Sequence, residues 1–249
     1  IKKNLLKIIN YNLNNNLVEP YFQAIMDNRT LEIVKYEALM RIFDKNGNIL
    51  MPNIFIHKAK KCRLYTKLME ILFDKIIIYI LKHNIHVSIN LDYIDILNPQ
   101  IKKSLISKIK EYEIGSFLTF EILESEKVSN FNMVNDFIKE VKKYGVKIAI
   151  DDFGTGFSNY ENILNLDIDY IKIDGSLIKK IDEDIYLNLI KSIVLFAKQQ
   201  NIKIVAEFVS DLKTLRYIRN IGIDFSQGYH IGKPMNINEL LGIEDEKRA

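Results

Sequence analysis

The chain repeats one pattern five times, in which a helix-like stretch ends at Gly or Asn and a short apolar strand follows. A polar residue then comes about six positions after the Gly or Asn. The pairs are Asn84 and Asn90, Gly115 and Glu121, Gly145 and Asp151, Asn201 and Glu207, and Gly222 and Gln227. Gly and Asn tolerate the left-handed backbone conformation that ends a helix. Each pair therefore predicts a helix stop and one strand whose end carries the polar side chain.

Two further strands carry a polar residue without the preceding helix stop, at Glu37 in IVKYEAL and at Lys172 in YIKID. Another strand in YFQAIMD precedes LEIVKYEALMRIF, and the turn-prone Asn28 and Arg29 between them predict a hairpin. Alternation of strands and helices over this length predicts an α/β fold, a TIM-like barrel of strands surrounded by helices. A parallel barrel would gather all seven polar strand ends at one mouth.

Alternation within the strands predicts which way these side chains point. Asn90, Glu121, Asp151 and Lys172 each lie on the side of the strand opposite its Ile, Leu, Val or Phe neighbours. Because the apolar sides belong under the helices, the polar side chains should converge in the barrel lumen.

The converging groups suit divalent cations. Carboxylate and amide oxygens are hard ligands of the kind that Mg²⁺ and Mn²⁺ prefer, and they are offered by Glu37, Asn90, Glu121 and Asp151. Asp152 directly follows Asp151, an arrangement that suits a paired site. A single carboxylate at a strand end is most often a solvated loop residue or a helix cap, so the prediction depends on the whole set. Lys172 has two open roles, as an ion-pair partner or as a residue that holds a water.

The composition bounds the other possibilities. With 249 residues and 48% hydrophobic content, residues 1–249 are expected to form a single domain. The net charge of +3 gives no basic field for a nucleic acid polymer, and no apolar run is long enough for membrane insertion. A lone Cys62 fits a reducing compartment such as the cytoplasm. The chain opens at Ile1 without Met, and we expect it to be cut from a longer multidomain protein, either soluble or membrane-attached.

These residues resemble a known family, the EAL domain, whose name stands here as Glu37, Ala38 and Leu39. The resemblance continues to Arg41 and covers nearly the whole chain. Its motifs, in order, are EALMR, SINLD, FEILE, DDFGTGFSNY, DYIKID, AEFVS and SQGYHIGKP. Members of this family are (β/α)8 barrels with an antiparallel first strand. They hydrolyse cyclic di-GMP to linear pGpG in bacterial second-messenger signalling, with two Mg²⁺ or Mn²⁺ ions as cofactors.

The resemblance implies a role for each matching residue. One ion would be bound by Glu37, Asn90, Glu121 and Asp151, and the second by Asp151 and Asp152. Glu207 would be the general base, and Lys172 would position the attacking water.

The resemblance also implies substrate contacts and a supporting loop. Gln23, Leu39 and Arg41 match the family's substrate contacts, with Arg41 on a phosphate, and Gln227 supports that binding set. Glu124 matches a glutamate that anchors the DDFGTG loop. Homodimers are common in the family and are an open expectation here.

The chain departs from the family pattern after the seventh barrel strand, where AEFVS replaces AEGVE. Phe208 stands in place of glycine and Ser210 in place of the second acid, while Glu207 is kept. Gly175 replaces a common arginine. Two alternatives to hydrolysis of cyclic di-GMP therefore stay open: a receptor or interaction module that binds without turnover, and a metallohydrolase for another phosphodiester.

Overall fold

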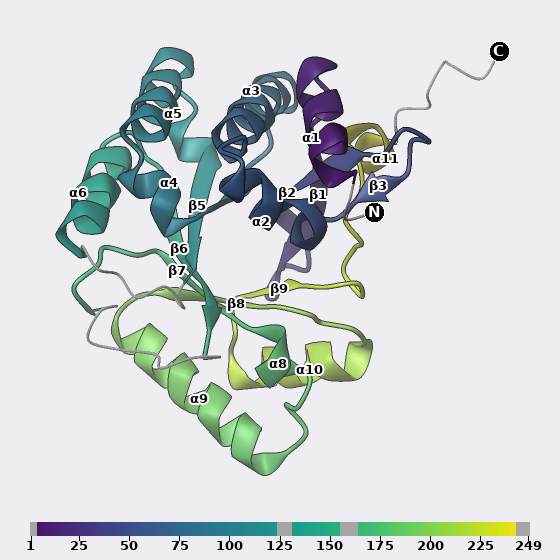
Figure 1. Cartoon of the computed structure of the whole chain (residues 1–249). Coiled ribbons are helices and arrows are strands. Elements are labelled where there is room, and N and C mark those ends of the chain that lie inside the picture. Colours follow the sequence, from purple (N-terminus) through teal and green to yellow (C-terminus); the bar gives the residue numbers. More distant parts are fainter. Residues whose placement is uncertain (1–3, 124–130, 155–163, 243–249) are drawn as a thin grey trace.

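The computed structural model describes residues 4–123, 131–154 and 164–242, and strands alternate with helices along the chain (Figure 1). The strands are β1 (Glu19–Asp27), β2 (Ile33–Phe43), β3 (Ile49–Leu50), β4 (Val87–Leu91), β5 (Leu118–Leu123), β6 (Lys147–Phe153), β7 (Tyr170–Ile173), β8 (Lys203–Ala206) and β9 (Phe225–Gln227). The helices are α1 (Leu5–Asn14), α2 (Pro52–Lys61), α3 (Tyr65–His83), α4 (Tyr93–Leu97), α5 (Pro99–Tyr112), α6 (Phe131–Lys142), α8 (Gly175–Ile178), α9 (Asp184–Gln199), α10 (Leu212–Ile221) and α11 (Ile237–Leu241).

The first two strands form the hairpin that the sequence predicts. At the turn, the Asp27 carboxylate accepts hydrogen bonds from the backbone N–H groups of Arg29 and Thr30, at 2.7 and 3.0 Å. A side chain that caps its own turn in this way helps to fix the hairpin. In the resulting antiparallel register, Gln23 lies opposite Glu37. Two residues of the predicted site are thus adjacent because of local turn chemistry.

The remaining strands close the hairpin into a barrel. β2 pairs in parallel with β4, and each strand from β4 to β9 pairs in parallel with the next. β1 is antiparallel to both β9 and β2, so it closes the ring, while β3 only extends the edge of β2. Within the described ranges this is a closed barrel of eight strands. The predicted barrel with an antiparallel first strand is confirmed.

Four of the five expected helix stops have a positive φ angle. They are Asn84, Gly145, Asn201 and Gly222. The prediction for Gly115 is wrong, because helix α5 ends at Tyr112 and the following residue, Glu113, takes the left-handed conformation itself. Gly115 instead opens a short 3₁₀ helix, and a Cβ atom there would overlap the carbonyl of Tyr144. Glycine is required at position 115 because the backbone there lies very close to the backbone of Tyr144.

The apolar core lies between the strands and the surrounding helices. Phe120 of β5, for example, stacks on Phe137 of α6 with ring centroids 5.9 Å apart, and both rings are buried. At the amino ends of the strands, the Lys35 ammonium lies 3.6 Å from the centre of the Tyr170 ring. Burial lowers the pKa of Lys35 to about 8. Side chains such as Lys35 and Tyr170 therefore occupy the lumen at the amino ends of the strands. The polar groups of the predicted site lie at the carboxyl ends.

Helices surround the barrel, with α3, α5 and α6 on one side and α9 and α10 on the opposite side (Figure 1). The inward face of the longest described helix, α3, buries Leu68, Leu72 and Ile76. None of the helices in the described part of the chain combines the length and the apolar character that crossing a membrane requires.

Candidate active site

The barrel mouth brings the predicted site residues together. They are Glu37 on β2, Asn90 on β4, Glu121 on β5, Asp151 and Asp152 on β6, Lys172 on β7, Glu207 just after β8, and Gln227 on β9. The parallel register places Asn90 directly beside Glu121. Strand alternation therefore points these side chains into the lumen, as the sequence predicts.

Lys172 is the centre of the cluster. Its Nζ lies 2.6 Å from Glu121 Oε2, 2.9 Å from Asp151 Oδ1, 2.9 Å from Glu207 Oε1 and 3.5 Å from Glu37 Oε2. Its side chain is 1% exposed. Burial alone would lower the pKa of Lys172, but the surrounding carboxylates outweigh it and raise this pKa well above its usual range. Of the two roles left open by the sequence, the ion-pair role is present in the structure.

Glu37 is fixed by two amides. Asn90 Nδ2 donates to Glu37 Oε1 and Gln227 Nε2 donates to Glu37 Oε2, each at 2.6 Å. Gln227 Nε2 also lies 3.2 Å from Gln23 Oε1, which links the cluster to β1. Burial raises the pKa of Glu37, but Lys172 and the two amide donors outweigh it and hold this pKa below its usual value. Glu37 is therefore an ionised and oriented carboxylate.

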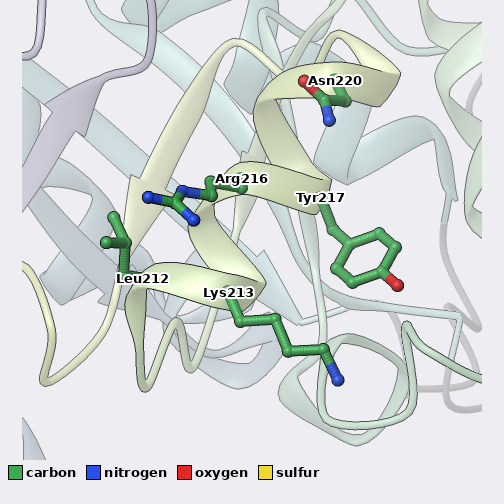
Figure 2. A pocket seen from close by; sticks show the side chains of 5 residues that line it. All are labelled: Leu212, Lys213, Arg216, Tyr217 and Asn220. Atoms are coloured by element: carbon green, nitrogen blue, oxygen red, sulfur yellow. The ribbon is translucent and has the colours of Figure 1, made fainter.

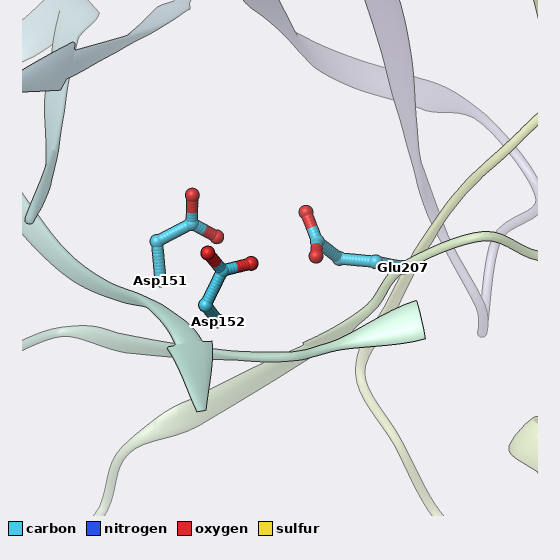
Figure 3. A group of neighbouring side chains, drawn as sticks. All are labelled: Asp151, Asp152 and Glu207. Carbon is cyan, nitrogen blue, oxygen red and sulfur yellow. The ribbon is translucent and has the colours of Figure 1, made fainter. Parts of the chain in front are cut away.

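Two of the Lys172 partners, Asp151 and Glu207, also lie close to a third carboxylate, that of Asp152. Oxygen atoms of Asp151, Asp152 and Glu207 lie within 4.8 Å of one another, and the three side chains face a common space (Figure 3). Asp152 has a φ angle of 56°, so the chain leaves the extended conformation there and consecutive side chains reach the same space. Burial, with the charge of Asp151 next in size, raises the pKa of Asp152 to about 6. Burial raises the pKa of Glu207 to about 8, an effect that Lys172 opposes.

The cluster fits divalent cations. Glu121 Oε1 is buried and has no hydrogen-bond partner among the described residues. Burial raises the pKa of Glu121 to about 7, because the attraction of Lys172 offsets that effect only in part. Several carboxylates crowded around one ammonium leave an excess of negative charge and of hard oxygen ligands, which suits Mg²⁺ or Mn²⁺. The assignment of Asp151 and its neighbours to particular ions stays a prediction.

A cavity of 680 Å³ opens at this mouth. All of the predicted substrate contacts line it, namely Gln23, Leu39, Arg41 and Gln227. Arg41 is buried, and its Nη1 donates to the carbonyl of Met40 at 3.0 Å. Asp152 and Glu207 line the same cavity, so the carboxylates and the guanidinium face one space large enough for a ligand.

A second hollow lies on the outer surface of α10 (Figure 2). It measures 280 Å³ and is lined by Leu212, Lys213, Arg216, Tyr217 and Asn220. This lining offers no carboxylate and does not include the residues of the barrel mouth. The larger cavity, which contains the carboxylates, is therefore the candidate active site.

The predicted loop support cannot be placed. Glu124 and residues 155–163, which include most of the DDFGTGFSN stretch, lie outside the described residues. Loop anchoring by Glu124 stays a prediction.

Phe208, at the position where the family pattern has glycine, lies in a sharp backbone turn. On one side of it, Glu207 N donates to Ile173 O at 3.2 Å, and on the other Val209 N donates to Gln227 O at 3.0 Å. These bonds join the segment to β7 and then to β9, so the chain must turn sharply between them. Phe208 makes this turn with a φ angle of 54°. A bulky residue thus takes a left-handed conformation that usually favours glycine.

The space for the Phe208 ring is provided by Gly175 of α8. A Cβ atom at Gly175 would lie 2.7 Å from Phe208 Cβ and would overlap the ring. The Lys179 ammonium lies 4.2 Å from the ring centre. The two departures from the family pattern, at positions 175 and 208, are therefore in direct contact. Sequence reasoning noted both and missed their relation, although their occurrence together was the available signal.

Ser210, the other altered residue, does not reach the carboxylate cluster. Its Oγ donates to Asp211 Oδ2 at 2.7 Å, and Asp211 caps α10 by accepting from Thr214 N at 2.8 Å. Ser210 is exposed. Serine at this position therefore places a neutral residue beside the cap residue Asp211 and takes no part in the Lys172 ion pairs.

The contact of Phe208 and Gly175 predicts strong coupling between the two positions. Gly175→Ala should destabilise the domain by about 1–3 kcal/mol, because the added methyl group overlaps the ring. The same substitution in a Phe208→Gly background should cost much less. Urea unfolding of both single variants and the double variant gives the coupling free energy. Additive effects would show that the two residues do not compete for space.

Comparisons with known proteins agree with this geometry. A family model described as EAL domain matches residues 7–234. The cyclic di-GMP phosphodiesterase PdeA of Borreliella burgdorferi is 33% identical over 244 residues, covering 94% of this chain and 36% of that protein. The cyclic di-GMP phosphodiesterase PdeF of Escherichia coli is 27% identical, covering 84% of this chain and 29% of that protein. The chain spans about a third of the length of these relatives.

Solved structures give the same fold. The PaMucR phosphodiesterase in its c-di-GMP complex superimposes with a TM-score of 0.87 at 23% identity, covering 95% of this chain and 99% of that one. An EAL domain protein from Listeria monocytogenes EGD-e gives a TM-score of 0.85 at 25% identity, covering 95% and 96%.

Proposed function

The chain belongs to the EAL domain family, and we propose that it is a metal-dependent phosphodiesterase that hydrolyses cyclic di-GMP to linear pGpG. The observation that carries the proposal is the position of Glu207. Its carboxylate lies in one cavity with Asp152 and Arg41 and is held 2.9 Å from Lys172 Nζ. Relatives named as cyclic di-GMP phosphodiesterases support the choice of substrate.

The roles of the residues follow from their chemistry. Arg41 binds a phosphate of the substrate, since a guanidinium pairs with phosphate oxygens through two parallel hydrogen bonds. Gln23 and Leu39 line the remainder of that site. Lys172 holds Glu207 in position. Glu207 is the carboxylate placed in the cavity to accept a proton from the attacking water.

The reaction adds one water across one phosphodiester. The water oxygen forms a bond to phosphorus, Glu207 accepts a water proton, and the bond from phosphorus to the 3′ oxygen breaks as that oxygen gains a proton. Bound divalent cations would supply charge stabilisation on the phosphate oxygens. The residues that would hold them are Glu37, Asn90, Glu121, Asp151 and Asp152.

A receptor that binds cyclic di-GMP without turnover is the second candidate. The altered segment at Phe208 and Ser210 favours it, because both side chains line the cavity beside Glu207. The ion pair that holds Glu207 beside Lys172 favours turnover. Homodimerisation, a role in second-messenger signalling and a cytoplasmic location stay predictions.

A turnover assay separates the two candidates. Purified protein incubated with cyclic di-GMP and Mg²⁺ or Mn²⁺ should release pGpG, detected by chromatography. A chelator should abolish the product, because the crowded carboxylates lose their counter-ions. Binding in Ca²⁺ or Mg²⁺ without any product would establish the receptor instead. A protein that neither binds nor cleaves the nucleotide would contradict both.

A further inference from the structure

The wall of the cavity carries aromatic rings paired with cations. Among the described residues, the pairs at this wall are Phe208 with Lys179 at 4.2 Å, Tyr229 with Lys233 at 5.5 Å, and Tyr21 with Arg41 at 5.6 Å. Aromatic rings stack on nucleobases, and cations attract the phosphate backbone. The lining is therefore suited to a ligand that has both bases and phosphates.

Phe208 differs from the other two rings in its backbone conformation. A left-handed residue other than glycine is strained by roughly 1–2 kcal/mol, and Phe208 has a φ angle of 54°. Such strain persists only where the surroundings hold it and is common at functional sites. Burial of the ring offsets little of this strain, because Phe208 is 55% exposed. A large apolar ring is thus held open at the mouth, next to Glu207.

Helix α8 holds the ring in that position. Gly175 is the first residue of α8, and Lys179 directly follows the last residue of this one-turn helix. The ring lies against Gly175, and the Lys179 ammonium lies over it at 4.2 Å. A side chain at position 175 would displace the ring. Gly175 therefore leaves room for the Phe208 ring, which is exposed and lines the cavity where a ligand would lie.

We infer that Phe208 is a base-stacking residue of this site, on which one purine base of the cyclic dinucleotide lies. The inference rests on the proposed function and specifies how this chain holds that substrate. Phe208 is a positioning residue, because stacking of the base fixes the adjoining phosphodiester near Glu207. The ring thus supplies a contact that glycine at this position cannot make.

Nucleotide affinity of Phe208 variants tests the inference. Calorimetry with cyclic di-GMP in Ca²⁺ measures binding by wild type, Phe208→Tyr, Phe208→Leu and Phe208→Gly. Base stacking on an aromatic side chain corresponds to roughly 5- to 150-fold in affinity, so the Leu and Gly variants should weaken by that range. Phe208→Tyr keeps the ring and should stay within about 3-fold of wild type.

The matched control is Tyr217→Leu. Tyr217 also lies near a lysine, with Lys213 Nζ 5.9 Å from its ring centre, but it is on α10 outside the cavity (Figure 2). The affinity of the Tyr217→Leu variant for cyclic di-GMP should equal that of wild type. Thermal melting shows whether each variant is folded, and Leu at position 208 should leave stability nearly unchanged because it keeps the same left-handed strain.

The outcomes separate the inference from the proposed function. If wild type binds cyclic di-GMP and Phe208→Leu binds equally well, stacking is wrong and the proposed function stands. If wild type does not bind, the proposed function fails and the inference fails with it. A further comparison uses cyclic di-UMP, whose smaller bases stack less strongly. The substitution Phe208→Leu should therefore weaken binding of cyclic di-UMP less than it weakens binding of cyclic di-GMP. An equal change for both nucleotides would overturn the assignment of a purine base.

Discussion

Glu207→Gln should lower kcat for cyclic di-GMP hydrolysis by about 10²- to 10⁴-fold, the range for loss of a general base. The amide keeps the size of the carboxylate but cannot accept the proton from the attacking water. Binding of the nucleotide in Ca²⁺ should change far less, because Arg41 and Gln23 line the cavity independently of Glu207. Rates of pGpG formation and calorimetric affinities provide the two measurements.

The matched control for this substitution is Glu111→Gln. Glu111 is an exposed residue of α5, on the outside of the barrel. Its variant should retain wild-type kcat and affinity. A Glu207→Gln protein that releases pGpG at the wild-type rate would exclude Glu207 as the base, whatever the control shows.

Much of the fold could be predicted because it depends on local chemistry and periodicity. Asn84 and Gly145 end their segments with positive φ angles as expected, and strand alternation places Glu121 and Lys172 in the lumen. The helix stop before β5 is predicted at the wrong residue, because a residue whose type does not favour the left-handed conformation takes it two positions earlier. Here Glu113 does so.

The features of the site that could not be predicted from the sequence are the contacts across the barrel mouth. Alternation alone would send Asp151 and Asp152 to opposite sides of β6, and only the turn at Asp152 brings both carboxylates to Glu207. The contact of Phe208 with Gly175 joins positions far apart in the chain. It depends on a left-handed bulky residue, which no propensity favours.

Lys172→Met should destabilise the metal-free domain by about 3–5 kcal/mol at pH 8, the cost of leaving buried charges without their partner. Methionine keeps much of the length and volume of lysine, so loss of packing is small. It removes the ammonium from the carboxylates of Glu121, Asp151 and Glu207, which lie 2.6–2.9 Å from Lys172 Nζ. Urea unfolding measures the difference. Lys147→Met is the control, since Lys147 is 52% exposed in its ion pair with Asp169 and should cost at most about 1 kcal/mol.

The cost of Lys172→Met should also depend on pH. Glu121 and Glu207 have pKa values raised to about 7 and about 8, from an ordinary value of 4.5. A carboxyl group whose pKa is raised by folding contributes stability that is fully present below its unfolded pKa, and this contribution is lost as pH rises through the folded pKa. Without the ammonium these pKa values rise further, so at pH 5 both groups are neutral and tolerate the missing partner. The destabilisation should therefore be smaller at pH 5 than at pH 8. An equal or greater loss at pH 5 would mean that Lys172 stabilises the barrel by packing and not by its charge.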